Sequence, residues 1–196
     1  AYTTVPKSTA FFNTKLYTGN GGTQTISGIG FEPSLAWFKA RSSTSHMLQD
    51  QCRGKTKFIE PNTTTGNQTS SDGISSFNSD GYAIGANGRL NSNNTSMVSW
   101  NWKANGQGSS NTTGSINTTY TSANTTSGCS IITYTGNGSA GATIGHGMGI
   151  KPSMIIIKNL TGNDWIVYTQ SLTANKILYL NTTGGQNDNN VFFNDV

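Results

Sequence analysis

The sequence predicts an all-β protein built from antiparallel β-sandwich units in tandem. The chain of 196 residues contains 24 Gly and is only 10% charged, with Asn, Thr and Ser abundant throughout. Short apolar runs alternate with turn residues at roughly the 8–12-residue spacing of sandwiches and barrels. No segment keeps an apolar period of 3.6 residues over three turns, which argues against a helical fold.

An internal repeat organises the chain. The segment Tyr17–Gly21 recurs as Tyr134–Gly138, 117 residues later, and Gly28–Ser34 matches Gly147–Ser153, 119 residues later. Further matches at the offset of 119 pair Lys39 with Lys158, Lys57 with Lys176, and residues 62–64 with 181–183. Because separate segments keep nearly one offset, we predict two superposable copies, with Tyr17 over Tyr134 and Lys39 over Lys158.

The copies set the expected domain boundaries. Residues 1–104 form the first β-rich unit, residues 105–128 a connector rich in Ser, Thr, Asn and Gly, and residues 129–196 a second, incomplete copy. Within the connector, Ser115–Tyr120 has strand character and aligns with the start of the chain, so an opening strand is expected in each copy.

The second copy lacks counterparts of Gly81–Gly85 and Met97–Trp102. Missing strands would leave sheet edges and apolar surface exposed. We therefore expect either a polypeptide that continues beyond Val196 or a homo-oligomer, a homotrimer in the first place. The expected interface covers Ile155, Ile157 and Val167 or their neighbours.

The strand predictions follow the β-branched and aromatic runs, at residues 14–17, 34–39, 97–102, 131–134, 153–158, 165–168 and 177–180. Asn20–Gly21 and Asn137–Gly138 each follow a strand and predict type I′ hairpin turns. Residues 34–39 and 153–158 are apolar on both faces, which predicts central strands.

Several functional classes are disfavoured by composition. The net charge of +4 is spread thinly, without the clustered Lys and Arg of a nucleic-acid interface. The longest apolar run, Met154–Ile157, is too short to span a membrane. Two cysteines, Cys52 and Cys129, do not make a disulfide framework, and we expect both to be unpaired core residues.

The sequence predicts no enzyme, no cofactor and no structural metal. His46 and His146 are not retained between the copies, and neither belongs to a metal-binding spacing. The few carboxylates are not paired by any pattern, so no acid–base couple is assigned. Catalytic, cofactor-binding and metal-binding residues are therefore expected to be absent, and no ligand-binding residue is assigned.

Trp100 and Trp102 alternate with Asn101 and should point to one face of a strand. Core packing is the favoured interpretation, because large aromatics are usually buried. The alternative is a stacking platform for sugar rings on an exposed face.

Six segments carry a family resemblance: residues 12–21, 28–33, 48–54, 77–82, 100–104 and 144–149. They resemble the tandem β-rich modules of tail-fibre-like, virion surface proteins of marine tailed phages. The resemblance covers nearly the whole chain. It implies a structural or adhesive part of a virus particle and brings no catalytic residues with it.

The expected function is thus a virion surface protein of a bacteriophage, as a tail-fibre or receptor-binding segment. Its expected partners are other copies of itself, other virion proteins and a host-surface glycan. A head-decoration or capsid fibre protein and a carbohydrate-binding adhesin module are the alternatives, and a glycan-degrading depolymerase ranks last.

Overall fold

The structure is a computed structural model that describes residues 7–42, 44–172 and 176–188. Nearly all of its regular structure is antiparallel β-sheet, which confirms the all-β class. In the first unit the strands are β1 (Phe12–Thr18), β2 (Gln24–Ser27), β3 (Leu35–Ala40), β4 (Met47–Asp50), β5 (Lys57–Phe58), β6 (Gln68–Thr69), β7 (Ile74–Asn78), β8 (Gly81–Ile84) and β9 (Ser96–Trp102). Beyond them lie β10 (Thr118–Asn124), β11 (Cys129–Tyr134), β12 (Met154–Lys158), β13 (Trp165–Thr169), β14 (Lys176–Tyr179) and β15 (Asn187–Asp188). A 3₁₀ turn at Ser8–Ala10 and the short helix α1 (Gly88–Asn91) complete the described elements.

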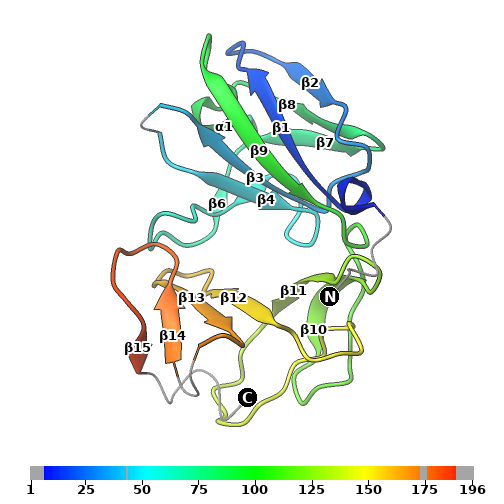
Figure 1. The fold of residues 1–196 in the computed structure, drawn as a ribbon, viewed down its shortest axis with the longest axis vertical. Helices are drawn as coiled ribbons and strands as arrows, with labels where there is room; N and C mark the ends of the chain where they lie inside the picture. The colour runs from blue at the N-terminus through cyan, green and yellow to red at the C-terminus, as the bar shows by residue number, and fades with distance from the viewer. Residues whose placement is uncertain (1–6, 43, 173–175, 189–196) are drawn as a thin grey trace.

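Two sheets face each other in the first unit (Figure 1). One has the strand order β1-β9-β3-β4 and the other β2-β8-β7. Between them lies an apolar core in which the Phe38 and Tyr82 rings meet edge to face, 5.2 Å apart. The Tyr82 hydroxyl donates a hydrogen bond of 2.6 Å to the Ser99 hydroxyl, so its buried polar atom is satisfied.

The hairpin predicted at Asn20–Gly21 is wrong. β1 pairs with β9 and β2 pairs with β8, so the loop between them crosses from one sheet to the other. Gly21 has a φ of 68°, but Asn20 does not have the positive φ that a type I′ turn needs. The buried side chain of Asn91 donates to Asn20 Oδ1 and to the Gly22 carbonyl, which holds the loop in its crossing path.

The second unit contains β11, which pairs with β10 of the connector, and a sheet of order β12-β13-β14-β15. Its pairing register matches that of the first unit: Leu35 lies opposite Asp50, and Met154 opposite Thr169. The β5–β6 and β14–β15 pairs also correspond, with Lys57 opposite Thr69 and Lys176 opposite Asp188. Each second-unit residue follows its counterpart by 119 positions.

Three expectations about strand position meet different outcomes. β3 is an inner strand as predicted, but β12, also predicted to be central, is the first strand of its described sheet. The strand expected at Ser115–Tyr120 lies later, at β10, because its pairing with β11 fixes the register. The opening strand expected at the start of the first copy falls on residues 1–6, outside the described residues.

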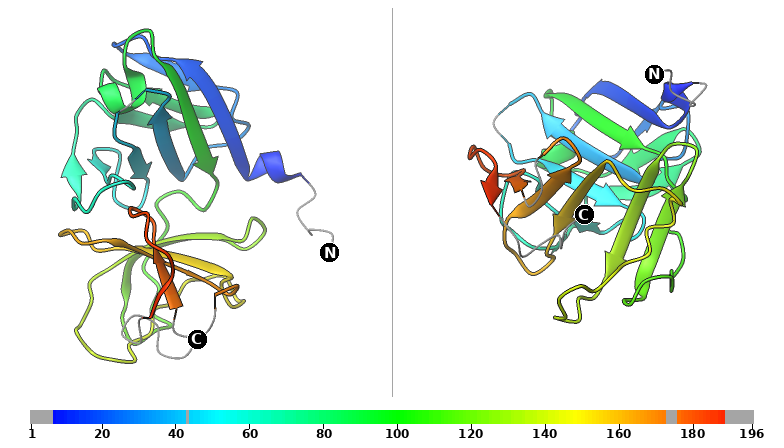
Figure 2. Two further views of the ribbon diagram at one scale, coloured as in Figure 1. Left: turned by 60° about the vertical axis from the view of Figure 1, so that its left-hand side comes forward. Right: turned by 60° about the horizontal axis from the view of Figure 1, so that its bottom comes forward.

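The two units contact each other through their sheets (Figure 2). Trp165 of β13 packs against Leu48 and Ile59, and its indole Nε1 donates to the Glu60 carbonyl at 3.1 Å. Val167, expected in an oligomer interface, is only 5% exposed within the chain, while Ile155 and Ile157 are half-buried. The chain itself therefore covers part of the surface that was expected to need a partner.

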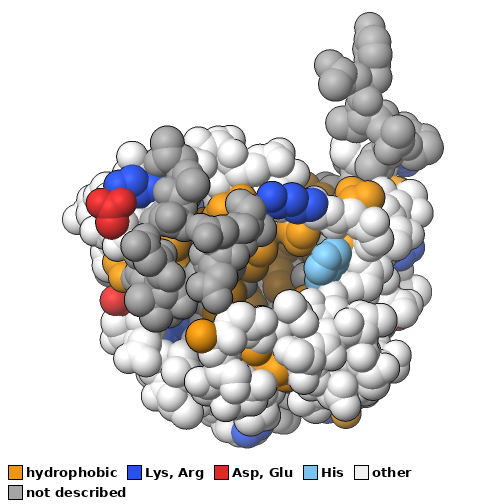
Figure 3. All heavy atoms as spheres, turned by 90° about the horizontal axis from the view of Figure 1, so that it is seen from below, with side chains coloured by type: hydrophobic (Ala, Val, Ile, Leu, Met, Phe, Trp, Pro, Cys, Tyr) orange, Lys and Arg blue, Asp and Glu red, His pale blue; other side chains and the backbone are white. Residues whose placement is uncertain are grey.

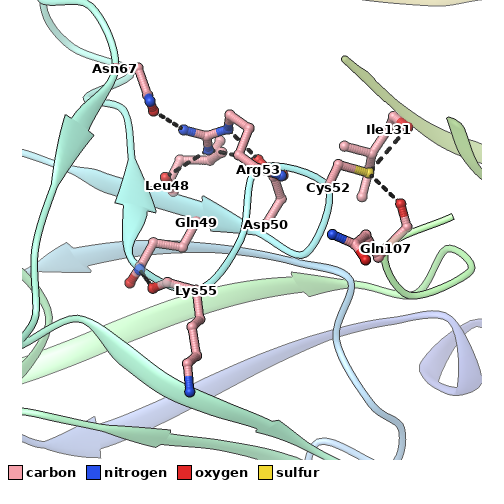
Figure 4. A network of polar contacts seen from close by, with 9 residues as sticks. All are labelled: Leu48, Gln49, Asp50, Cys52, Arg53, Lys55, Asn67, Gln107 and Ile131. Atoms are coloured by element: carbon pink, nitrogen blue, oxygen red, sulfur yellow. Dashed lines mark hydrogen bonds and ion pairs between the residues drawn. The ribbon is translucent and has the colours of Figure 1, made fainter. Parts of the chain in front are cut away.

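A polar network at the β4–β5 turn reinforces the junction (Figure 4). The Arg53 guanidinium forms a 2.6 Å ion pair with Asp50 and also donates to Asn67 and to the Leu48 carbonyl. Next to it, the Cys52 thiol lies between two carbonyl acceptors, 3.3 Å from that of Gln107 and 3.5 Å from that of Ile131. The turn thereby connects the first unit to the segment before β10 and to β11. None of the described helices has the length and apolar character needed to cross a bilayer.

Candidate functional site

The outer face of the four-stranded sheet carries half-exposed aromatic side chains. Along β9, Met97, Ser99 and Asn101 are buried toward the three-stranded sheet. Trp100 and Trp102 alternate with them and are half-buried on the opposite face. Their common face was predicted correctly. It lies opposite the core between the two sheets, and neither tryptophan is fully buried.

The strand register assembles rows of side chains across this outer face. Residues directly opposite on paired strands project to the same side of a sheet. One row contains Thr14, Trp100 and Trp37, and the next contains Phe12, Trp102 and Leu35. A third row contains Leu16, Val98 and Lys39. We call these nine residues the aromatic face.

The rings of the aromatic face fix one another in place. Phe12 and Trp102 have centroids 5.0 Å apart at an interplanar angle of 53°, and Trp37 and Trp100 lie 5.9 Å apart at 69°. Tilted and edge-to-face pairs of this kind are the favourable geometries for aromatic rings. Phe12 is nevertheless 38% exposed and Leu16 is 68% exposed. A clustered apolar surface of this type is characteristic of interaction sites.

His46 lies at the border of the aromatic face. The Trp37 indole Nε1 donates a 2.9 Å hydrogen bond to His46 Nδ1, which places the imidazole proton on Nε2. Burial lowers the pKa of His46, and the nearby Lys39 lowers it further. At neutral pH the ring is therefore uncharged and presents an N–H donor beside the aromatic rings.

Lys39 gives the face a positioned cation. Its ammonium donates to the carbonyls of Ala40 at 2.6 Å and Ser42 at 2.7 Å. These bonds hold the charge at the end of the row formed with Val98 and Leu16. The face therefore combines apolar rings with donors at its border, the mixture found in sites that bind partly polar ligands.

The second unit borders the aromatic face on one side. Trp37 and Leu35 belong to the face and also pack against the cluster of Leu48, Ile59 and Trp165. The Lys158 ammonium lies 5.6 Å from the centre of the Trp165 ring, and burial lowers the pKa of that lysine. Contact with the second unit thus fixes one edge of the face, while the β1 and β9 side chains remain partly open.

The carboxylates have structural partners within the chain. Each one in the described residues accepts a hydrogen bond or forms an ion pair: Glu32, Asp50, Glu60, Asp72, Asp80, Asp164 and Asp188. Asp80 accepts the backbone N–H groups of Gly30 and Gly28, and these bonds hold its pKa below the ordinary value. In this arrangement the carboxylates serve as acceptors for groups of the same chain.

The other residues that sequence analysis considered lie elsewhere. His146 sits in the loop before β12, where its Nδ1 accepts from Met148 N at 3.2 Å. Cys52 and Cys129 are both free, and burial raises the pKa of Cys52 to about 12. Across residues 7–42, 44–172 and 176–188, no group of three His, Cys, Asp or Glu side chains is placed to hold a metal ion.

Sequence reasoning missed Phe12, Trp37 and His46 as members or neighbours of the site. The sequence shows the aromatic residue Phe12, and Trp37 within an apolar strand, but not which side of either strand is exposed. The pairing of β9 with both β1 and β3 brings the rings together, and no local sequence pattern reports this pairing.

Comparison with known proteins places the chain in one family. No curated protein and no solved structure gives a match. A family model described as "Domain of unknown function (DUF7483)" matches residues 7–196, all but the first six residues of the chain. The chain therefore belongs to the DUF7483 family.

Proposed function

We propose that this chain is a non-enzymatic adhesive module on the virion surface of a tailed phage, a tail-fibre or receptor-binding segment. Its aromatic face binds a host-surface glycan. The observation that carries the glycan assignment is the half-exposed set of Phe12, Trp100 and Trp102 on the outer face of the sheet. The C–H face of a sugar ring is apolar and can cover an aromatic ring, while its hydroxyls accept from donors at the border.

The resemblance of six segments to phage surface modules supports the virion assignment. The fixed ring geometry supports adhesion, because a surface held in place before binding loses little conformational entropy when a ligand arrives. A homotrimer, with other virion proteins as neighbours, remains part of the proposal. Light scattering on the purified chain tests it, and a stable monomer that melts cooperatively would contradict it.

A head-decoration or capsid fibre protein is the second candidate. The observation that favours it is apolar surface on β12, where Met154 is 56% exposed and Ile156 is 43% exposed. Exposed apolar side chains on a strand edge suit assembly with other polypeptides. In this function the second unit, rather than the aromatic face, binds the neighbouring virion proteins.

We also propose that residues 1–104 and 129–196 are tandem copies of one β-sandwich unit. The matching registers of β3–β4 with β12–β13 support this. Two hydrogen bonds recur at the offset of 119: Gln51 N to Ser34 O (2.9 Å) matches Gln170 N to Ser153 O (3.0 Å), and His46 N to Asn62 Oδ1 (2.9 Å) matches Trp165 N to Asn181 Oδ1 (2.8 Å). An experimental structure in which the matched strands superpose would be the direct test.

Binding to a panel of purified bacterial surface polysaccharides tests the adhesive function. Trp102→Ala should weaken binding at least tenfold, which corresponds to about 1.4 kcal/mol. Ile150→Ala is the matched control, because Ile150 is 70% exposed but lies outside the aromatic face. Equal loss in both variants, or unchanged binding in Trp102→Ala, would contradict the assignment.

The non-enzymatic part of the proposal has its own test. Incubation of the purified protein with each polysaccharide that it binds should release no new reducing ends. Release of reducing ends that disappears when one carboxylate is replaced by its amide would make the protein a depolymerase and overturn this part.

A further inference from the structure

Two strands of the second unit have an open edge. β11 pairs with β10 on one side, and β12 pairs with β13 on one side; no strand in the described part of the chain pairs with their other edges. An open edge presents a row of backbone N–H and C=O groups that can pair with another strand.

The counterparts of these strands in the first unit show what such an edge accepts. β11 begins at Cys129, 117 residues after Phe12 of β1, and β12 begins at Met154, 119 residues after Leu35 of β3. β1 and β3 both pair with β9, which lies between them and runs antiparallel to each. Ser99 of β9, for example, lies opposite a residue of β1 and a residue of β3.

β11 and β12 belong to different sheets and do not pair with each other. Figure 2 (right) shows β10 and β11 on one side and β12 and β13 on the other, with a separation between them. Figure 3, seen from below, shows that this underside is hollowed and that hydrophobic side chains form the floor of the hollow. We call the space between the open edges of β11 and β12 the strand slot.

The residues beside the strand slot are apolar, like residues that pack against a neighbouring strand. Met154 and Ile156 are exposed on β12, and Ile155 and Ile157 alternate with them and are half-buried. Tyr134 at the end of β11 is 37% exposed. A strand with apolar residues on both faces is typical of the interior of a sheet, where other strands lie on both sides.

We infer that the strand slot binds an extended strand that resembles β9. The strand runs antiparallel to β11 and β12 and has the alternation of β9. Its inward side chains correspond to Met97, Ser99 and Asn101 of β9, and its larger apolar side chains face outward like Trp100. Backbone hydrogen bonds to two edges supply affinity, and the alternate side chains supply specificity, as in strand addition generally. The inference rests on the proposed repeat and is independent of glycan binding.

A peptide with the β9 sequence tests the strand slot. The peptide covers residues 94–104 and carries terminal lysines for solubility; the control peptide has Ser99→Pro, which removes a ladder donor and prevents two-sided pairing. With the full 196-residue chain, the β9 peptide should slow amide hydrogen exchange in both β11 and β12, whereas the proline peptide should not. Absence of protection, or protection of β1 instead, would overturn the inference.

Variants of the chain sharpen the test. Ile156→Asp places a charge beside the slot at an already exposed position and should weaken peptide binding at least tenfold. Ile150→Asp, at a more exposed position outside the described strands, should leave binding unchanged. Equal effects of the two variants would contradict the inference.

Two further measurements identify the occupant of the strand slot and separate strand binding from glycan binding. A concentration-dependent dimer in which β11 and β12 are protected without peptide would make a second copy the occupant and overturn the proposed one. Trp102→Ala should lose glycan binding and keep peptide binding, so failure of the glycan proposal and failure of the strand proposal are separate results.

Discussion

The Arg53 guanidinium joins β4 to the loop before β6. It pairs with Asp50, binds the Asn67 side chain and donates to the Leu48 carbonyl. The side chains of the ion pair are only 6% and 4% exposed, so solvent cannot replace a lost partner. The corresponding positions of the second unit are Leu172 and Thr169, and the network is therefore particular to the first unit.

Replacing Arg53 with an uncharged residue should destabilise the fold, because it leaves the buried Asp50 carboxylate without its ion-pair partner. Arg53→Met should lower the free energy of unfolding by about 3–5 kcal/mol, because Asp50 loses its partner in a site that water does not reach. Arg41→Met, at an exposed position, should change it by no more than about 0.5 kcal/mol. Urea unfolding measures both, and similar stabilities of the two variants would contradict the role given to the pair.

His46 should take up its proton at a pH below the ordinary pKa of histidine. Its folded pKa is lowered, chiefly by burial, so the unfolded state binds the proton more readily. The stability that neutral His46 contributes is complete above the unfolded pKa of about 6.5 and is lost as pH falls through the lower folded value.

Protonation also removes the acceptor for the Trp37 indole, so tryptophan fluorescence reports it. The wild-type emission should change with a midpoint below about 6.5, and His46→Gln should lack this transition. A midpoint at or above that value, or an identical transition in the variant, would show that His46 does not accept from Trp37.

At the scale of strands, composition predicts where the strands lie but does not predict all of the connections between them. The β-branched and aromatic runs predict β1, β3, β9 and β11–β14 close to their observed bounds. The Asn20–Gly21 hairpin failed because the loop is held by Asn91, 71 residues away in sequence. No local signal at Asn20 reports a partner that distant.

The helix α1 acts mainly through Asn91, whose side chain is fully buried. Its amide NH2 donates to the Gly22 carbonyl at 2.7 Å and the Gly85 carbonyl at 2.8 Å, and its Oδ1 accepts from Asn20 N at 2.9 Å. Asn91→Ala should lower the free energy of unfolding by about 1–3 kcal/mol, because buried acceptors lose their donor. Asn93→Ala, two residues away and exposed, is the control and should be nearly neutral in the same thermal melt. Equal effects would mean that the crossing loop does not depend on Asn91.

At the scale of the whole molecule, the sequence repeat predicts two related units. It could not indicate how they pack, since Trp165 replaces His46 at the matched position and contacts the first unit. The candidate site was only half visible: alternation placed Trp100 and Trp102 on one face, but which face is the core depends on the second sheet. That sheet is formed by β2, β8 and β7, whose pairings join segments far apart in sequence.

The most direct test of the central claim is an NMR titration of the protein with a polysaccharide that it binds. The titration follows the indole N–H signals of the four tryptophans. Trp100 and Trp102 lie on the aromatic face, whereas the Trp165 indole is buried and donates to the Glu60 carbonyl. The account predicts that the Trp100 and Trp102 signals shift with saturation while the Trp165 signal stays in place. Binding that leaves the Trp100 and Trp102 signals unmoved would contradict the assignment of the aromatic face as the glycan-binding surface.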